Sequence, residues 1–264
     1  MLTPWLKLLR VVNFPTVPGD VFVGAAAAMW WCECRAGSPQ LWLSVGMAAL
    51  SSCALYLYGL VDNDIVGAPT DAGRPIPDGE ISMRAARIAR AACLVLGFLP
   101  LAGVYRCHFE ATALGAASYS LVPTALVFAI AAYNRSKRPT LMGLCRGINV
   151  LLGVAAVAPP IFWPRLFAEA PTSGATFAIA LLVAVWIAYI SAVTRYSEGE
   201  ESDPERRRRV GLLIEGVVHL QMLALVVLTL LWPSHCTRRL LVAGAVMLVL
   251  LRTFKKVFKK VSAS

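Results

Sequence analysis

The chain has 264 residues, of which 58% are hydrophobic and only 15% are charged. Soluble domains hold about 45–50% apolar and about 25% charged residues, so this composition excludes a single water-soluble core. The apolar residues also form long uninterrupted runs, which are typical of membrane-spanning helices. We therefore predict an all-α, polytopic transmembrane helical bundle that forms one domain over residues 1–264, with a basic tail.

Membrane spans of about 17–25 mostly apolar residues are expected from the thickness of a bilayer. Eight segments are candidates: 15–31, 41–61, 88–105, 113–132, 141–162, 175–194, 210–232 and 240–251. The last is short, and the basic, helix-compatible pattern from Arg252 to Lys260 extends it toward the membrane surface. We expect about eight spans, with nine as the upper count.

The chain carries 25 Lys and Arg residues against 15 Asp and Glu residues, a net charge of +10. If alternate loops are assigned to opposite sides of the membrane, one side holds few of these basic residues. That side has only Arg35, Arg106, Arg165, Arg238 and Arg239. The positive-inside rule then predicts that both termini are cytoplasmic, in a bacterial inner (plasma) membrane. No recognition module surrounds the arginine run 206–209, so we predict no nucleic-acid partner.

Some of the seven cysteines fall on the predicted outer side of the membrane. These are Cys32, Cys34, Cys107 and Cys236. An oxidising compartment would permit disulfides among them. The preferred interpretation is small apolar side chains at the membrane rim. The sequence does not decide whether they pair.

Two loops on the predicted cytoplasmic side carry acidic residues. The first contains Asp62, Asn63, Asp64, Asp71, Arg74 and Asp78. On a helix, Asn63 and Gly67 share one face, and Asp71 follows one turn later if the helix continues. Such a row of oxygens suits Mg²⁺, which proteins hold through one or two carboxylates together with substrate phosphate oxygens. The second loop, 195–205, is acidic and then basic; by composition alone, a solvated loop is its better interpretation.

Polar residues inside the predicted spans need a reason to be there. Arg146 and Asn149 are three residues apart and share a helix face. Arg146 either faces the bundle interior as a functional group or anchors the helix end at the membrane surface. Asp20 interrupts the first span, where an unpaired carboxylate would be costly. It either faces a cavity or pairs with a basic neighbour.

The first acidic loop resembles the first motif of the UbiA superfamily of intramembrane prenyltransferases, Asn-x-x-x-Asp-x-x-x-Asp followed by Arg-Pro-(Ile/Leu)-Pro-x-Gly-x-Ile-Ser. The matching residues are Asn63, Asp64, Asp71, Arg74, Pro75, Ile76, Pro77, Gly79, Ile81 and Ser82. The chain departs from the motif at Gly67, where the family places its first aspartate. The linker from Asp71 to Arg74 is also shorter than usual.

Two further segments bear on this resemblance. Residues 133–153 resemble the family's fourth loop and fifth helix, and they include Lys137, Arg146 and Asn149. The family's second motif, Asp-x-x-x-Asp, is not present in the loop 189–205. Glu198 stands near the expected first position of that motif. The chain therefore looks like a divergent branch of the superfamily.

The resemblance implies a UbiA-like fold and a Mg²⁺-dependent transfer of a polyprenyl group from its diphosphate to an acceptor, either aromatic or another small electron-rich molecule. The implied catalytic residues are Asp64, Asp71 and Arg146. The implied diphosphate-binding residues are Asn63, Arg74, Lys137, Arg146 and Asn149. The implied Mg²⁺ ligands are Asn63, Asp64, Asp71 and Glu198. Membrane lipids would be further partners.

The altered motifs leave a second function open. A non-catalytic protein that binds or carries an isoprenoid lipid on the same scaffold is the alternative. A secondary transporter ranks last, because such proteins have internal repeats and paired broken helices, and the two halves of this sequence show no convincing repeat.

Overall fold

The computed structural model describes residues 2–9, 11–31, 39–71, 73–108, 113–158, 174–199, 203–231 and 235–261. Its helices are α1 (Leu2–Leu8), the 3-10 helix η1 (Val11–Thr16), α2 (Val17–Trp31), α3 (Pro39–Gly67), α4 (Met83–His108), α5 (Ala113–Ser136), α6 (Pro139–Val157), α8 (Gly174–Ser197), α9 (Pro204–Leu231) and α10 (His235–Val261). No strand occurs among these described residues. The predicted all-α fold is confirmed.

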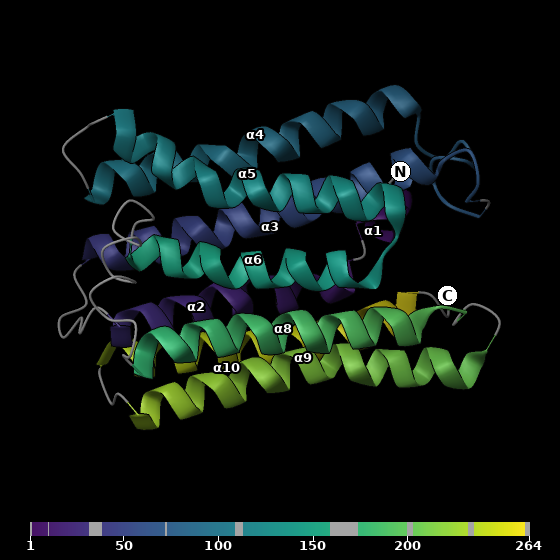
Figure 1. Ribbon diagram of the computed structural model, residues 1–264. Coiled ribbons are helices and arrows are strands. Elements are labelled where there is room, and N and C mark those ends of the chain that lie inside the picture. Colours follow the sequence, from purple (N-terminus) through teal and green to yellow (C-terminus); the bar gives the residue numbers. More distant parts are fainter. Residues whose placement is uncertain are drawn as a thin grey trace.

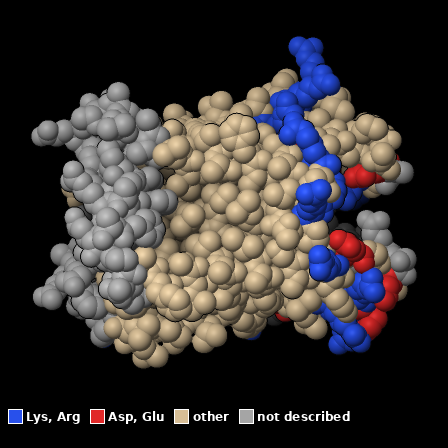
Figure 2. Space-filling model, in the orientation of Figure 1, with Lys and Arg blue, Asp and Glu red and all other residues tan. Residues whose placement is uncertain are grey.

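The long helices run side by side along one common axis (Figure 1). α6 lies inside the bundle and packs against α2, α5 and α8, while α3 packs mainly against α4. The loops that follow α3, α5 and α8 lie at one end of the bundle, together with α1. We call this the charged end, because Figure 2 shows Lys, Arg, Asp and Glu gathered there beside a broad face without charged residues.

Each of the eight predicted spans overlaps one helix. Within the described residues, five helical segments are long and apolar enough to cross a membrane: Pro39–Gly67, Met83–Gly103, Pro139–Val157, Thr176–Ser197 and Pro204–Leu231. The count of eight spans is therefore not confirmed. α10 does continue through the basic segment to Val261, as its helix-compatible pattern predicts.

Prolines shift two of the predicted boundaries. The segment expected to begin at residue 15 is still a 3-10 helix at that point, with Pro15 inside it, and the α-helix begins at Val17. The segment expected to reach residue 162 ends as a helix at Val157. Ala158 is extended, with φ −117° and ψ 99°. It precedes Pro159 in the sequence, and the α conformation is disfavoured for a residue before proline.

Two glycines bring α2 and α6 into close contact. A Cβ atom at Gly24 would lie 1.9 Å from the carbonyl oxygen of Val150, and one at Gly153 would lie 2.0 Å from that of Val21. Small residues of this kind let helix backbones approach each other inside membranes. The close approach fixes the position of α2 relative to α6, and these two helices carry the main polar residues of the bundle interior.

Candidate functional site

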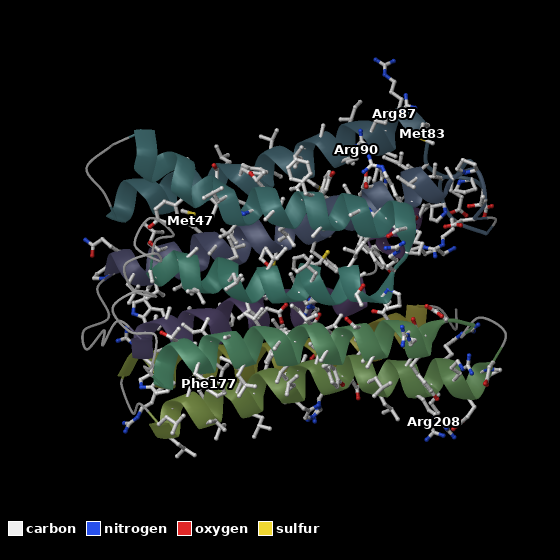
Figure 3. All side chains as sticks on the ribbon, viewed as in Figure 1. Met47, Met83, Arg87, Arg90, Phe177 and Arg208 are labelled. Atoms are coloured by element: carbon white, nitrogen blue, oxygen red, sulfur yellow. The ribbon has the colours of Figure 1, made fainter. Side chains whose placement is uncertain are left out.

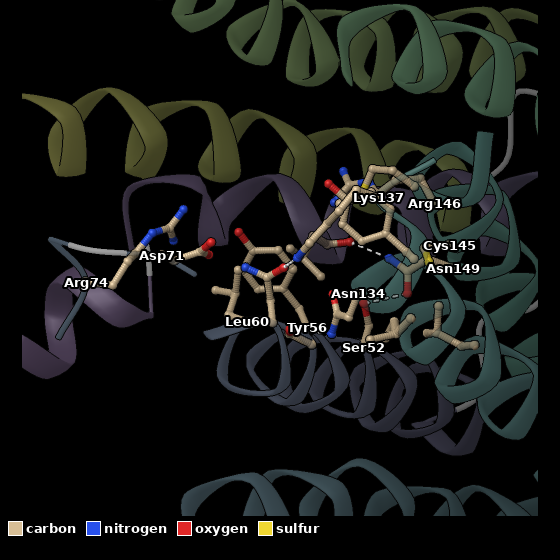
Figure 4. Close-up of a pocket in the computed structure, with 17 residues that line it drawn as sticks. Ser52, Tyr56, Leu60, Asp71, Arg74, Asn134, Lys137, Cys145, Arg146 and Asn149 are labelled. Carbon is tan, nitrogen blue, oxygen red and sulfur yellow. Dashed lines mark hydrogen bonds between the residues drawn. The ribbon is translucent and has the colours of Figure 1, made fainter. Parts of the chain in front are cut away.

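A cavity of about 280 Å³ lies between α2, α3, α5 and α6 (Figure 4). It is lined by Val17, Ser52, Tyr56, Gly59, Leu60, Asn63, Asp71, Arg74, Leu126, Ile130, Tyr133, Asn134, Lys137, Met142, Cys145, Arg146 and Asn149. Along α3 the lining runs from Asn63 near the charged end to Ser52, which corresponds to about 16 Å of helix. The cavity is therefore elongated. Asp71, Arg74 and Lys137 line the part nearer the charged end, Arg146 and Asn149 lie further in, and apolar side chains line the rest.

Asp71 lies close above Gly67. Its backbone N–H donates to the Gly67 carbonyl at 2.9 Å, which prolongs the path of α3 by one turn. Thr70 Oγ1 donates to Asp71 Oδ1 at 3.1 Å. A Cβ atom at Gly67 would lie only 2.3 Å from Asp71 Oδ2. The Asp71 carboxylate thus occupies the space that a side chain at position 67 would need.

The two other acids of this segment point elsewhere. Asp64 Oδ1 accepts a hydrogen bond from Arg74 Nη1 at 3.2 Å, and the Asp64 side chain is only 2% exposed. Arg74 lines the cavity, whereas Asp64 does not. Asp62 pairs with Arg90 at 3.0 Å and accepts from Asn134 Nδ2 at 2.8 Å. Of the three acids, Asp71 alone reaches the cavity wall.

Lys137 connects the turn between α5 and α6 to α3. Its backbone has a φ of 55°, a left-handed conformation that side-chain-bearing residues rarely adopt. Its N–H donates to the Tyr133 carbonyl at 2.7 Å, which caps the end of α5. Its Nζ donates to Asn63 Oδ1. The strained turn therefore directs an ammonium group into the charged part of the cavity.

Arg146 pairs with Asp20 inside the bundle. The Nε of Arg146 lies 2.8 Å from Asp20 Oδ2, and its Nη2 donates to Asp20 Oδ1 at 3.1 Å and to the Thr16 carbonyl at 2.8 Å. Asp20 is fully buried. Of the two alternatives for each residue, Arg146 faces the interior, and Asp20 pairs with a basic neighbour.

Three more donors reach the same carboxylate from α6, α8 and α9. Asn149 Nδ2 donates to Oδ2 of Asp20 at 3.2 Å, while Trp186 Nε1 and Gln221 Nε2 donate to Oδ1 at 2.8 Å and 2.7 Å. Ser52 Oγ donates to Asn149 Oδ1 at 2.7 Å and links this network to α3. Trp186 and Gln221 were not predicted from the sequence. The sequence did offer one sign of this contact, because Gln221 is a polar residue inside an apolar span.

The second acidic loop does not contribute a lining residue to the cavity within the part of the chain that is described. Glu198 is exposed, and its backbone carbonyl accepts from Arg206 at 2.7 Å. Asp203 caps α9 by accepting from the N–H groups of Glu205 and Arg206 at 2.9 Å and 3.1 Å. The bond from Arg206 lowers the pKa of the Asp203 carboxyl below its usual range. A role for Glu198 in metal binding stays a prediction.

The fit of Mg²⁺ to the cavity depends on its oxygen donors. Among the described residues, no three His, Cys, Asp or Glu side chains are grouped so as to hold a metal ion. Mg²⁺ needs only one or two carboxylates when substrate phosphates complete its shell. Asn63 and Asp71 both line the cavity and supply oxygens of this kind. Asp71 fits a Mg²⁺ ion that is shared with a phosphate-bearing substrate, and Asn63 Oδ1 would join it once the Lys137 ammonium, which donates to that oxygen here, turns to the substrate phosphate.

Three cysteines, Cys53, Cys93 and Cys145, are free thiols. The side chains of the four predicted outer cysteines lie outside the described part of the chain. Disulfide formation among them therefore stays a prediction.

The long apolar helices define an integral membrane protein. A comparison with protein families matches residues 21–262 to the UbiA prenyltransferase family. The chain belongs to this family, which confirms the resemblance inferred from its motifs. A comparison with curated protein sequences finds no match.

Solved structures with the same fold are distant in sequence. A UbiA homologue from Archaeoglobus fulgidus matches with a TM-score of 0.53 and 15% identity, covering 97% of this chain and 87% of that one. The same homologue bound to GPP and Mg²⁺ matches with a TM-score of 0.50 and 16% identity, covering 97% of this chain and 87% of that one. A digeranylgeranylglyceryl phosphate synthase matches with a TM-score of 0.50 and 13% identity, covering 97% of this chain and 95% of that one. At these identities the similarity establishes the fold alone.

Proposed function

We propose that this protein is a membrane-embedded prenyltransferase that moves a polyprenyl group from its diphosphate to a small electron-rich acceptor, with Mg²⁺ as cofactor. The observation that carries the proposal is one cavity lined by Asn63, Asp71, Arg74, Lys137 and Arg146 and walled by apolar side chains. Such a cavity suits a molecule with an anionic head and a hydrocarbon tail. Structures of a UbiA homologue bound to GPP and Mg²⁺ and to DMAPP and Mg²⁺ support it.

The charged part of the cavity would bind the diphosphate. Arg74 and Lys137 supply fixed positive charge near its end, and Asp64 holds the Arg74 guanidinium in place. Asn63 and Asp71 would hold Mg²⁺, which when bound supplies further positive charge against the departing diphosphate. Preorganised charges of this kind stabilise a transition state in which negative charge develops on the leaving group.

Arg146 and Asn149 lie further along the cavity on α6, and the Asp20 carboxylate holds both side chains. Arg146 would therefore present a fixed guanidinium toward the bound substrate, whereas Asn149, whose amide group already donates to the Val17 carbonyl and to Asp20, would shape the cavity wall. Their position does not change on binding unless the buried network breaks, so little reorganisation accompanies the reaction.

The apolar walls would hold the prenyl chain and exclude water. Leu60, Leu126, Ile130 and Met142 line this part of the cavity. Each buried methylene contributes about 0.8 kcal/mol to binding. Departure of diphosphate leaves an allylic cation, which water would quench, so a dry cavity favours transfer of the chain to the acceptor.

The second candidate is a protein that binds or carries an isoprenoid lipid without catalysis. Gly67 in place of an aspartate, and the lack of the second motif in the sequence 189–205, favour it. Release of diphosphate from radiolabelled prenyl diphosphates by the purified protein separates the two functions. A prenyltransferase releases diphosphate, whereas a carrier binds the substrate and leaves it intact.

Substitution of Lys137 tests the role of the strained turn. Lys137→Gly removes the ammonium group and relieves the left-handed backbone, whereas Lys137→Met removes the charge and keeps the strain. We expect both variants to bind prenyl diphosphate more weakly than wild type, and to similar degrees. Lys137→Gly should unfold at a higher temperature than Lys137→Met in a thermal melt in detergent. Equal substrate affinity in wild type and both variants would exclude Lys137 from the binding site.

The orientation of the protein in the membrane is a separate proposal. We place the charged end and both termini in the cytoplasm of a bacterial inner membrane, because most basic residues lie at that end. Reporter fusions after Ser264 should be active with a cytoplasmic reporter and inactive with a periplasmic one. A periplasmic-active fusion at that point, with a cytoplasmic-active fusion after Val61, would contradict an even number of spans.

A further inference from the structure

A second cavity lies at the charged end, on the outside of the bundle. Its volume is about 590 Å³, and it is lined by Pro139, Thr140, Ala188, Ser191, Ala192, Arg195, Tyr196 and Arg206. These residues come from the start of α6, the end of α8 and the start of α9. None of them lines the first cavity. We call this cavity the α8 groove.

The floor of the α8 groove is one face of α8. Ala188, Ser191, Ala192 and Arg195 are spaced so that they share a face of the helix. Ala188, Ala192 and Arg195 are exposed. Ala188 and Ala192 belong to the apolar span Thr176–Ser197, and Arg195 lies near its end, so the groove joins an apolar surface to a charged one.

Two arginines lie at the charged end of the groove. Arg206 is held in place, because its Nη1 donates to the Glu198 carbonyl at 2.7 Å and its guanidinium lies 5.7 Å from the centre of the Tyr196 ring. The Arg195 guanidinium makes no hydrogen bond or ion pair with any described residue. No carboxylate is among the described lining residues. Arg206 also lies near the Asp203 carboxylate, whose pKa it lowers, so Arg195 is the cation of the groove that lacks a partner among the described residues. Such a cation favours an anionic ligand.

We propose that the α8 groove binds one anionic phospholipid. Its phosphate lies between Arg195 and Arg206, where the hydroxyl groups of Thr140 and Tyr196 are further donors, and an acyl chain lies along Ala188 and Ala192. Basic pockets between helices at a membrane surface bind anionic headgroups in this way. The position of the groove, with a charged end and an apolar floor, favours a lipid over a soluble anion. This inference does not depend on the proposed transfer reaction.

Lipid retention by the purified protein tests the proposal. Native mass spectrometry in detergent counts bound dioleoylphosphatidylglycerol and dioleoylphosphatidylcholine supplied in equal amounts. We expect wild type to retain the glycerol lipid preferentially, and Arg195→Gln to reduce that retention about fivefold, which corresponds to about 1 kcal/mol per arginine. Arg195→Lys, which keeps the charge, should retain the lipid. Because Arg195 is exposed, neither substitution should prevent folding.

Arg208→Gln is the matched control. Arg208 is exposed and projects away from the bundle on α9 (Figure 3). Its substitution therefore removes the same charge as Arg195→Gln, but outside the groove. It should retain the lipid as wild type does. Equal retention by Arg195→Gln and wild type overturns the proposal, and so does equal loss in Arg195→Gln and Arg208→Gln. Displacement of the lipid by millimolar inorganic phosphate would show that a soluble anion is the occupant.

Discussion

Replacement of Asp20 by alanine is expected to lower the free energy of unfolding by about 3–5 kcal/mol, the usual cost of removing one partner of a buried ion pair. The substitution leaves the Arg146 guanidinium buried without its carboxylate. It also removes the acceptor for the donors of Asn149, Trp186 and Gln221. Thermal and denaturant unfolding of the purified protein in detergent measure the loss.

Two further variants separate this effect from a general loss of packing. The double variant Asp20→Ala with Arg146→Met removes both charges, so it should be more stable than Asp20→Ala alone. Glu80→Ala removes an exposed carboxylate and should unfold like wild type. A single variant Asp20→Ala as stable as wild type would show that the network does not hold the four helices together.

Replacement of Asp71 by alanine is expected to lower the rate of diphosphate release by at least about 100-fold. Charge stabilisation by a bound metal ion is worth several kcal/mol, and each 1.36 kcal/mol changes a rate about tenfold. Asp71 is the acid of the first motif that reaches the cavity wall, so its loss would remove the proposed carboxylate ligand of Mg²⁺. Single-turnover release from radiolabelled prenyl diphosphate at saturating Mg²⁺ measures the change.

Glu80→Gln is the matched control for Asp71. Glu80 belongs to the same loop, is exposed and does not line the cavity. This variant should keep the wild-type rate, and both variants should unfold at the wild-type temperature, because Asp71 follows the end of α3 and lies outside the packed helices. If Asp71→Ala and Glu80→Gln release diphosphate equally fast, Asp71 is not a metal ligand.

Much of the cavity could be predicted because the residues belong to a motif. Asn63 and Arg146 are far apart in the sequence, and no periodicity brings them together. The UbiA resemblance does so, since it implies that α3 and α6 are neighbours, and both residues line one cavity. The positions of the helices were equally predictable, because an apolar run long enough to cross a membrane indicates a helix.

Three features were beyond the sequence for physical reasons. Trp186 and Gln221 join Asp20 across three helices, and such a contact depends on how α8 and α9 rotate, which long apolar runs do not specify. The Asp71 carboxylate above Gly67 depends on the turn that follows α3. Asp62 pairs with Arg90 because α3 packs against α4, and Asp64 pairs with Arg74 because of the fold of the next loop. The sequence specifies neither the packing nor the loop.

The most direct test of the central claim is diphosphate release by the purified wild-type protein, measured with radiolabelled prenyl diphosphates of several chain lengths, with and without Mg²⁺. A prenyltransferase should release diphosphate from at least one of them in the presence of Mg²⁺, and a chelator should abolish release. Tight binding of these substrates without release at any chain length or Mg²⁺ concentration would contradict the enzyme function and favour a lipid carrier.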